Sequence, residues 1–259
     1  MRSSRQDGRR WPGAVAAQVR CVERWLRPHV VPARRDFLHG GYAKSRSQWM
    51  GVPVPAMRAL ARDLDRRLKD EPPRAVIALV LALACCTTIE CRLTGYELLA
   101  RRDDAMAALR RADIDRLGRG NDNWAAVDTF ATLIAGPAWV AGIVRDVDVR
   151  RWAAASDPWW RRTAIVSTVP LNLRSRGGRG DARRTLMICR RFAAERDPML
   201  AKALSWALRS LVPHDPSAVR AFLEDYASTL PAIVRREVSA KLEIGKKRVA
   251  NVRRRRLLA

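Results

Sequence analysis

The 259-residue sequence is short of acidic residues. It has 26 Asp and Glu against 50 Lys and Arg, which leaves a formal net charge of +24 at pH 7. Lysine is rare as well, because 44 of the 50 cationic residues are arginine. A cationic excess of this size draws a protein to polyanions through counterion release, whatever its fold. The composition therefore predicts nucleic acid as the partner.

Long apolar runs are also missing. The longest, Ala75 to Cys86, spans 12 residues, whereas a membrane helix needs about 20. The N-terminus is arginine-rich and lacks the apolar core of a secretory signal, so we expect neither secretion nor membrane insertion. An arginine-rich start is also typical of mitochondrial transit peptides, and this alternative stays open.

Cysteine and histidine are few and scattered. The five cysteines form no C-x-x-C pair, and the three histidines lie far apart. An odd number of thiols, three of them in or beside the apolar run, is typical of a reduced cytosol, so we predict a cytoplasmic protein of the bacterial cytosol or nucleoid. This spacing supports neither zinc ligation nor a Cys/His nucleophile, and we expect no metal and no cofactor.

The apolar pattern is helical, and strand-type alternation is hard to find. Apolar residues recur three and four apart, which predicts an all-α protein. Asp-Pro pairs mark helix starts at Asp157, Asp197 and Asp215, since Asp caps free N–H groups and Pro is accepted at the first helical position. The first two starts lie 40 residues apart, within the range of two-helix HEAT-type repeats. We predict a curved, HEAT-like α-solenoid with a basic concave surface that suits a duplex.

Three parts are predicted along the chain. Residues 1–41 form an Arg-rich segment that leads into the first helices, residues 42–245 form the HEAT-like repeat domain, and residues 246–259 form a basic tail. Such a tail is most commonly a solvated charge run. The Gly- and Arg-rich segment 174–181 follows no predicted strand, so we interpret it as a flexible loop that touches phosphate rather than as a dinucleotide motif.

Three predicted helices carry residues that break their own apolar pattern, and such residues tend to mark functional sites. In the helix that follows Asp197, Trp206 projects opposite a row of leucines, with Lys202 four residues before it and Arg209 three after. A stripe of cation, indole and cation is typical of a surface that meets a sugar-phosphate backbone or an unstacked base. The alternative is a tryptophan buried against the next repeat.

The other two helices place polar groups within or beside an apolar face. Arg162 falls in the middle of the apolar stripe of its helix, so it must be ion-paired or line a groove. Trp124 and Asp128, four residues apart, share the edge of a core stripe, where an indole face lies beside a carboxylate. The alternatives are a salt-bridged structural Arg162, a core Trp124 and an ordinary polar Asp128.

Together these segments resemble the AlkD-like family of DNA alkylation repair glycosylases, over about Tyr42 to Lys241. The likeness rests on four motifs in the family's order, with Val in place of the family's Ser at the start of the last: Trp124-Ala-Ala-Val-Asp128, Trp159-Trp-Arg-Arg162-Thr-Ala-Ile165, Lys202-Ala-Leu-Ser-Trp206-Ala-Leu-Arg209 and Val234-Arg-Arg-Glu-Val238.

The resemblance implies a solenoid that wraps duplex DNA and hydrolyses the N-glycosidic bond of cationic N3- or N7-alkylpurines, as in base excision repair. It implies a monomeric, monofunctional glycosylase that acts on alkylated double-stranded DNA without a cofactor. Its catalytic residues would be Asp128, Trp124 and Trp206, and its DNA-binding residues Arg162, Arg161, Lys202 and Arg209. Arg161 directly precedes Arg162, and we assign Arg162 to the arginine position of the family's motif by its register before Thr-Ala-Ile, with a slip of one residue to Arg161 as the alternative.

The chemistry of the leaving group agrees with this assignment. A cationic alkylpurine departs without being protonated, so one carboxylate suffices where glycosidases use two. Asp128 would stabilise the oxocarbenium-like sugar and position water. No lysine is placed to form a Schiff base, so strand cleavage is not expected.

Two other classes of protein compete with this interpretation. A non-catalytic HEAT-like protein could bind nucleic acid or an acidic protein through the same basic face. A phosphate-transferring enzyme fits less well, because the sequence lacks a Gly-rich phosphate loop and a carboxylate cluster for magnesium.

Overall fold

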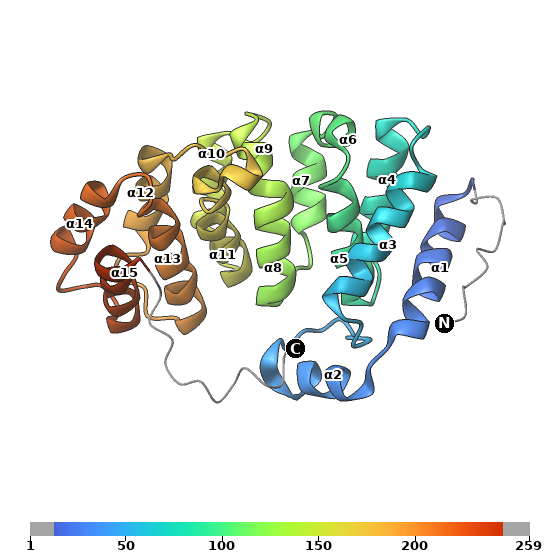
Figure 1. The fold of residues 1–259 in the computed structure, drawn as a ribbon, viewed down its shortest axis with the longest axis horizontal. Helices are drawn as coiled ribbons and strands as arrows, with labels where there is room; N and C mark the ends of the chain where they lie inside the picture. Colours follow the sequence, from blue (N-terminus) through green and yellow to red (C-terminus); the bar gives the residue numbers. More distant parts are fainter. Residues whose placement is uncertain (1–12, 246–259) are drawn as a thin grey trace. The chain divides into compact units, whose positions relative to one another are not determined.

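The computed structural model describes residues 13–245, and these residues form helices and no strand (Figure 1). A single isolated bridge joins Gln48 and Thr88. The prediction of an all-α protein is confirmed. The chain divides into two compact units, residues 1–126 and 127–259. The predicted basic tail, 246–259, and the first twelve residues lie outside the described part of the chain.

The first unit is built around one buried helix pair. Its helices are α1 (Val15–Leu26), α2 (Pro32–Phe37), α3 (Val54–Arg67), α4 (Pro73–Ala84), α5 (Ile89–Leu99), α6 (Asp103–Ala107) and α7 (Arg111–Gly118). α4 and α5 pack on each other, and α1 and α3 pack against this pair. α4 is apolar on nearly every side and α5 is buried almost throughout, as expected for central helices.

A buried carboxylate fixes the segment that leads into α3. Glu90 in the first turn of α5 is fully buried, and its oxygens accept hydrogen bonds from the backbone N–H groups of Met50, Gly51 and Val52. A buried charge needs such partners, because desolvation without them is costly. Glu90 thereby joins α5 to the chain between α2 and α3.

The second unit consists of successive helices that pack in pairs. α8 (Trp124–Phe130) runs across the boundary between the units and is followed by α9 (Gly136–Val140), α10 (Asp146–Ala153), α11 (Pro158–Val166), α12 (Ala182–Arg191), α13 (Pro198–Leu211), α14 (Pro216–Asp225) and α15 (Ala232–Ile244). α10 packs on α11, α12 on α13, and α13 also packs on α11 and α15. The assignment of these pairs to the HEAT class stays a prediction.

The predicted helix starts are confirmed at all three Asp-Pro pairs. The carboxylates of Asp157, Asp197 and Asp215 each accept hydrogen bonds from backbone N–H groups in the first turn, and the following proline occupies the first helical position. α11 and α13, whose first residues are 40 positions apart, therefore both begin with an Asp N-cap followed by proline.

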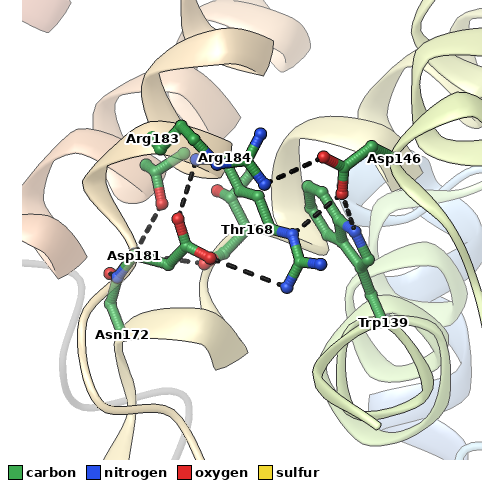
Figure 2. Close-up of polar contacts among 8 residues, drawn as sticks. Trp139, Asp146, Thr168, Asn172, Asp181, Arg183 and Arg184 are labelled. Carbon is green, nitrogen blue, oxygen red and sulfur yellow. Dashed lines mark hydrogen bonds and ion pairs between the residues drawn. The ribbon is translucent and has the colours of Figure 1, made fainter. Parts of the chain in front are cut away.

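A cluster of charges joins α9, α10 and α12 (Figure 2). Asp146 accepts hydrogen bonds from Trp139 Nε1 at 2.9 Å, Arg184 Nε at 2.8 Å and Arg183 Nη2 at 3.0 Å. Partial burial raises the pKa of Asp146, but the hydrogen bonds from these three donors lower it by more, so the net shift is downward. Two of the many arginines are thus used to hold neighbouring helices together.

The Gly- and Arg-rich segment before α12 is not the flexible loop that the sequence suggested. Asn172 Oδ1 accepts from the N–H of Asp181, and its Nδ2 donates to Thr168 (Figure 2). The N–H groups of Gly178 and Gly180 bond to carbonyls of the preceding turn. A Cβ on Gly178 would lie 2.0 Å from the carbonyl oxygen of Pro170, so this position requires glycine. The loop is held by hydrogen bonds and close packing.

Candidate active site

The candidate site is centred on an ion pair between α8 and α11. Arg162 Nε donates to Asp128 Oδ1 and Arg162 Nη2 donates to Asp128 Oδ2, each at 2.8 Å. The Arg162 side chain is 6% exposed and that of Asp128 is 17% exposed. Two parallel bonds between a guanidinium and a carboxylate are the strongest geometry that this pair offers. We call Asp128, Arg162 and the groups that they contact the Asp128 site.

Burial of the neighbouring apolar residues explains where these side chains lie. Val127 and Phe130 of α8 and Ile165 of α11 are fully buried, so each helix turns an apolar face to the core. The Arg162 side chain is itself nearly closed to solvent, so its guanidinium takes the carboxylate as a partner in place of water.

Arg162 also contacts a third helix. Its Nη1 donates to the backbone carbonyl of Met199, in the first turn of α13. One side chain thus ties α8, α11 and α13 together. The sequence left open whether Arg162 is ion-paired or lines a groove. The structure shows the ion pair and names Asp128 as its partner.

Burial and pairing act in opposite directions on the carboxylate. Burial raises the pKa of Asp128, whereas the hydrogen bonds and charge of Arg162 lower it, and the net shift is upward from the ordinary value of an aspartic acid. The physical cause is removal of water from the carboxylate, which penalises its charged form. A carboxylate in such a place interacts strongly with any further charge brought beside it, since the surroundings screen poorly.

Trp124 lies in an aromatic cluster within the first unit. Its Nε1 donates to the carbonyl of Tyr42 at 2.8 Å, and its ring meets that of Tyr42 edge to face at 5.2 Å. Phe37 contacts Tyr42 from the other side at 4.7 Å. Phe37 and Tyr42 are both 43% exposed, and Trp124 itself is half-buried. The alternative of a fully buried core tryptophan is therefore not what the structure shows.

Tyr42 and Phe37 were missed by sequence reasoning. Tyr42 ends a π-helical turn, Leu38–Tyr42, in which Gly41 has a φ of 121°. This conformation favours glycine and turns the chain sharply, which presents Tyr42 to Trp124. The Gly40-Gly41-Tyr42 sequence is the only local signal, and it predicts a turn without indicating what the tyrosine contacts.

The predicted stripe on α13 is present in part. The four leucines of the helix are buried, Lys202 is exposed and Trp206 is half-buried. Arg209 departs from the expectation of an open cation, because its side chain is only 18% exposed. Its Nε donates to Ser205 Oγ at 3.2 Å, and its Nη2 lies 3.6 Å from Glu237.

Glu237 gives the late motif on α15 a structural role. Its carboxylate accepts a 2.6 Å hydrogen bond from Ser205 Oγ and faces Arg209. Burial lowers the pKa of Arg209, and the charge of Glu237 opposes that shift. The motif from Val234 to Val238 therefore supports α13 through Glu237, while its two arginines, Arg235 and Arg236, are exposed.

Arg161 and Arg162 point to different partners. Arg161 pairs with Glu195 beyond the end of α12, and its guanidinium lies over the ring of Phe192, 5.4 Å from the centroid. Only Arg162 reaches Asp128. Arg162, assigned to the family's arginine position by its register in the sequence, is thus the one of the two whose side chain meets another predicted site residue.

A small pocket borders the Asp128 site. It has a volume of about 70 Å³ and is lined by the first residues of α11 and α13, namely Pro158, Trp159, Arg162, Asp197, Met199 and Leu200. The two aspartates that begin these helices use their carboxylates as N-caps. The charged residues of its lining are Arg162, which is paired with Asp128, and Asp197, which caps α13.

Comparisons with known proteins identify the class to which this arrangement belongs. Residues 23–242 match the family model described as DNA alkylation repair enzyme. The chain therefore belongs to this family, and the resemblance drawn from the motifs is confirmed. The match begins at residue 23, ahead of Tyr42, where the motif-based likeness began. Membership indicates a role in the repair of alkylated DNA and, with it, DNA binding.

A solved structure agrees with this fold. A predicted DNA alkylation repair enzyme from Enterococcus faecalis is similar with a TM-score of 0.64 and 17% identity, covering 83% of this chain and 98% of that one. At this identity the likeness concerns the fold. Comparison with curated proteins gives no match. Among the helices of residues 13–245, none combines the length and the apolar character that crossing a membrane requires.

Proposed function

We propose that this protein is a monofunctional DNA glycosylase that hydrolyses the N-glycosidic bond of cationic N3- or N7-alkylpurines in duplex DNA. The observation that carries the proposal is the buried carboxylate of Asp128, held by two hydrogen bonds from Arg162. The Asp128 side chain stays 17% exposed, so its carboxylate would face a bound nucleotide while Arg162 holds it in place.

Asp128 would act on the sugar rather than on the base. An N-alkylated purine already carries a positive charge, so it leaves as a neutral base and the positive charge develops on the deoxyribose. A fixed carboxylate beside that ring stabilises the charge as it forms, and burial strengthens the attraction. Because the interaction grows toward the transition state, it raises the rate of bond cleavage rather than only the affinity.

The same carboxylate would hold the attacking water. Each carboxylate oxygen has two acceptor positions, and Arg162 occupies one on each oxygen. A water that donates to Oδ1 or Oδ2 is thereby oriented toward the sugar, and it passes a proton to that carboxylate oxygen as the C–O bond forms. Arg162 fixes the plane of the carboxylate, which keeps this geometry constant from one turnover to the next.

Arg162 is also proposed to contact the DNA backbone. Its bonds to Asp128 and Met199 use one hydrogen on each guanidinium nitrogen, and the second hydrogens of Nη1 and Nη2 would donate to a phosphate. The pocket of about 70 Å³ beside Arg162 supplies space next to this group. Arg161, Lys202 and Arg209 remain proposed DNA-binding residues, with the exposed Lys202 the most accessible of them.

The tryptophans would recognise the cationic nucleotide. Trp124 begins the helix that carries Asp128, and Trp206 lies on the helix whose first turn contacts Arg162. Both are half-buried, so part of each indole can meet a ligand. Attraction between an indole face and a cation contributes about 0.5–2 kcal/mol, depending on desolvation. Tyr42, in edge-to-face contact with Trp124, holds that ring in place.

The test is base release from a duplex oligonucleotide that carries one 7-methylguanine. The protein is incubated with the duplex, and alkali then cleaves any abasic site. We expect cleavage only after alkali, because no lysine is assigned to a Schiff base. Binding to the duplex with no abasic sites above the enzyme-free background would reject the proposal in favour of a non-catalytic DNA-binding protein. Strand cleavage before alkali would reject the monofunctional mechanism.

A further inference from the structure

Two thiols and a carboxylate meet in the first unit. Glu23 on α1, Cys86 just after α4 and Cys91 in the first turn of α5 bring one ligand atom each to within 4.8 Å of one another. Cys91 is fully buried, and Glu23 and Cys86 are half-buried. Glu23 and Cys91 lie in helices that pack on each other, and Cys86 lies in the short turn between α4 and α5, where its N–H donates to the carbonyl of Leu83.

The donor set suits a thiophilic divalent cation. Zn²⁺ binds Cys sulfur at about 2.3 Å and carboxylate oxygen at about 2.0–2.2 Å in tetrahedral geometry, which separates ligand atoms by roughly 3.4–3.8 Å. The three ligand atoms, which lie within 4.8 Å of one another, would move closer to reach that spacing when the ion binds. Sequence reasoning expected no metal, because the cysteines form no C-x-x-C pair and the histidines lie far apart. The folded chain brings Glu23 close to the two cysteines, where it can act as the third ligand.

The surroundings favour an occupied site. Arg92, next to Cys91 and buried, is close enough for its charge to act on Cys86. Together with a divalent ion, this cation balances the charge of two thiolates and one carboxylate. Thr88 lies beside Cys91, and its hydroxyl would donate to a metal-bound thiolate, which is a better acceptor than a thiol.

We propose that Glu23, Cys86 and Cys91 bind one Zn²⁺ ion, with water in the fourth position, and that the ion ties α1 to the pair formed by α4 and α5. The role is structural. None of the three proposed ligands is among the residues proposed for the glycosylase reaction, so metal binding is tested separately from base excision.

The experiment is a titration of the full-length, metal-free, reduced protein with Co²⁺, which replaces Zn²⁺ and gives a thiolate charge-transfer absorption. We expect the absorption to saturate at one equivalent and to be displaced by Zn²⁺. It should be lost in Cys86→Ser and in Cys91→Ser. Glu23→Gln should weaken Co²⁺ affinity at least about tenfold. Zn²⁺ should raise the Tm of the wild type, since an ion that binds only the folded state stabilises it.

Two cysteines outside the cluster provide matched controls. Cys85 is exposed beside Cys86, and Cys189 is buried in the second unit. Cys85→Ser and Cys189→Ser should keep the absorption and the rise in Tm. Because Cys91 is fully buried, folding of each variant is checked by circular dichroism, and Cys86→Ser at a half-buried position stands in if Cys91→Ser unfolds.

Several results would overturn the proposal. One is a wild-type protein that shows no thiolate absorption under reducing conditions. Another is an absorption that persists in Cys86→Ser, which would place the ligands elsewhere. A third is a rise in Tm with Zn²⁺ that is equal in wild type and Cys86→Ser, which would mean nonspecific binding. Mass spectrometry that finds a Cys86–Cys91 disulfide in the freshly isolated, metal-free protein would assign the pair to redox chemistry instead.

Discussion

Arg162 binds Asp128 through two hydrogen bonds of 2.8 Å, one to each carboxylate oxygen. The pair is nearly closed to solvent, with 6% of the arginine side chain and 17% of the aspartate side chain exposed. Removing either partner leaves the other as a buried charge, which costs about 3–5 kcal/mol in comparable pairs. Each substitution below is therefore measured for folding as well as for excision.

The pair predicts a pH profile for excision. The pKa of Asp128 is raised by burial and lowered by Arg162, with the net shift upward. The carboxylate must be ionised to act, so single-turnover excision should fall as pH decreases through a pKa above the ordinary value of about 3.9. Arg162→Gln removes the cation that lowers this pKa. The acid limb of the profile, which is the fall in excision rate at low pH, should therefore move to higher pH.

Arg162→Lys is the matched control for that shift. Lysine keeps the positive charge and loses the paired geometry, so the acid limb should move less than in Arg162→Gln. Both variants should lose about 100-fold in rate at the pH optimum, as expected when a reacting group is misplaced by about 1 Å. An acid limb that stays in place in both variants would show that Arg162 does not set the charge state of the reacting carboxylate.

The charge of the damaged base should decide whether the protein releases it. We expect release of 7-methylguanine and 3-methyladenine, and no release of uracil or 8-oxoguanine. A neutral base needs an acid to protonate it as it leaves, and the proposed site supplies one carboxylate and no second acid. The measurement is excision from four duplexes of otherwise identical sequence. Efficient uracil release would mean that another group acts as a general acid.

Trp206→Ala should reduce binding and excision with little loss of stability. Trp206 is half-buried, whereas Leu204 on the same helix is fully buried. Leu204→Ala should cost about 2–5 kcal/mol in the free energy of unfolding, as buried leucines do. Trp206→Ala should lower the Tm by less than half as much. If the two variants lose Tm equally and Trp206→Ala keeps its activity per folded molecule, Trp206 is a core residue and not part of the site.

The basic tail should add affinity without adding chemistry. Lys246, Lys247, Arg248 and Arg253 to Arg256 supply seven cations outside the described residues. Each phosphate contact contributes about 0.9 to the slope of log K against log salt, so four contacts contribute about 3.6. Truncation after Gly245 should flatten the slope by this amount and leave single-turnover excision unchanged at saturating enzyme. An unchanged slope would show that the tail does not bind DNA.

Helices were predictable where local rules decide them. The Asp-Pro pairs at Asp157, Asp197 and Asp215 identify their helix starts, because capping depends on adjacent residues alone. The buried leucine row of α13 follows from periodicity in the same way. The hydrogen-bonded loop before α12 was not predictable, since its order depends on Asn172 and on close contact with Pro170.

The site was predictable as a set of residues and not as a set of contacts. The break in the apolar pattern identified Arg162, and an edge position identified Asp128. Their pairing joins residues 34 positions apart, and no local rule encodes it. The burial of the Arg209 side chain depends on its contact with Glu237, which lies on another helix. Exposed cations and buried paired ones look alike in a sequence with 44 arginines, because burial is decided by tertiary packing.

The central claim is that the Asp128 carboxylate stabilises the transition state, and Asp128→Asn tests it most directly. Asn keeps one acceptor oxygen for Arg162 and removes the charge, so the variant should fold, which circular dichroism and its Tm will show. It should bind the duplex as well as wild type or slightly better, since a charge that repels phosphate is gone. Single-turnover release of 7-methylguanine at saturating enzyme should fall at least about 100-fold. A folded, DNA-saturated Asp128→Asn that releases the base at nearly the wild-type rate would contradict the account.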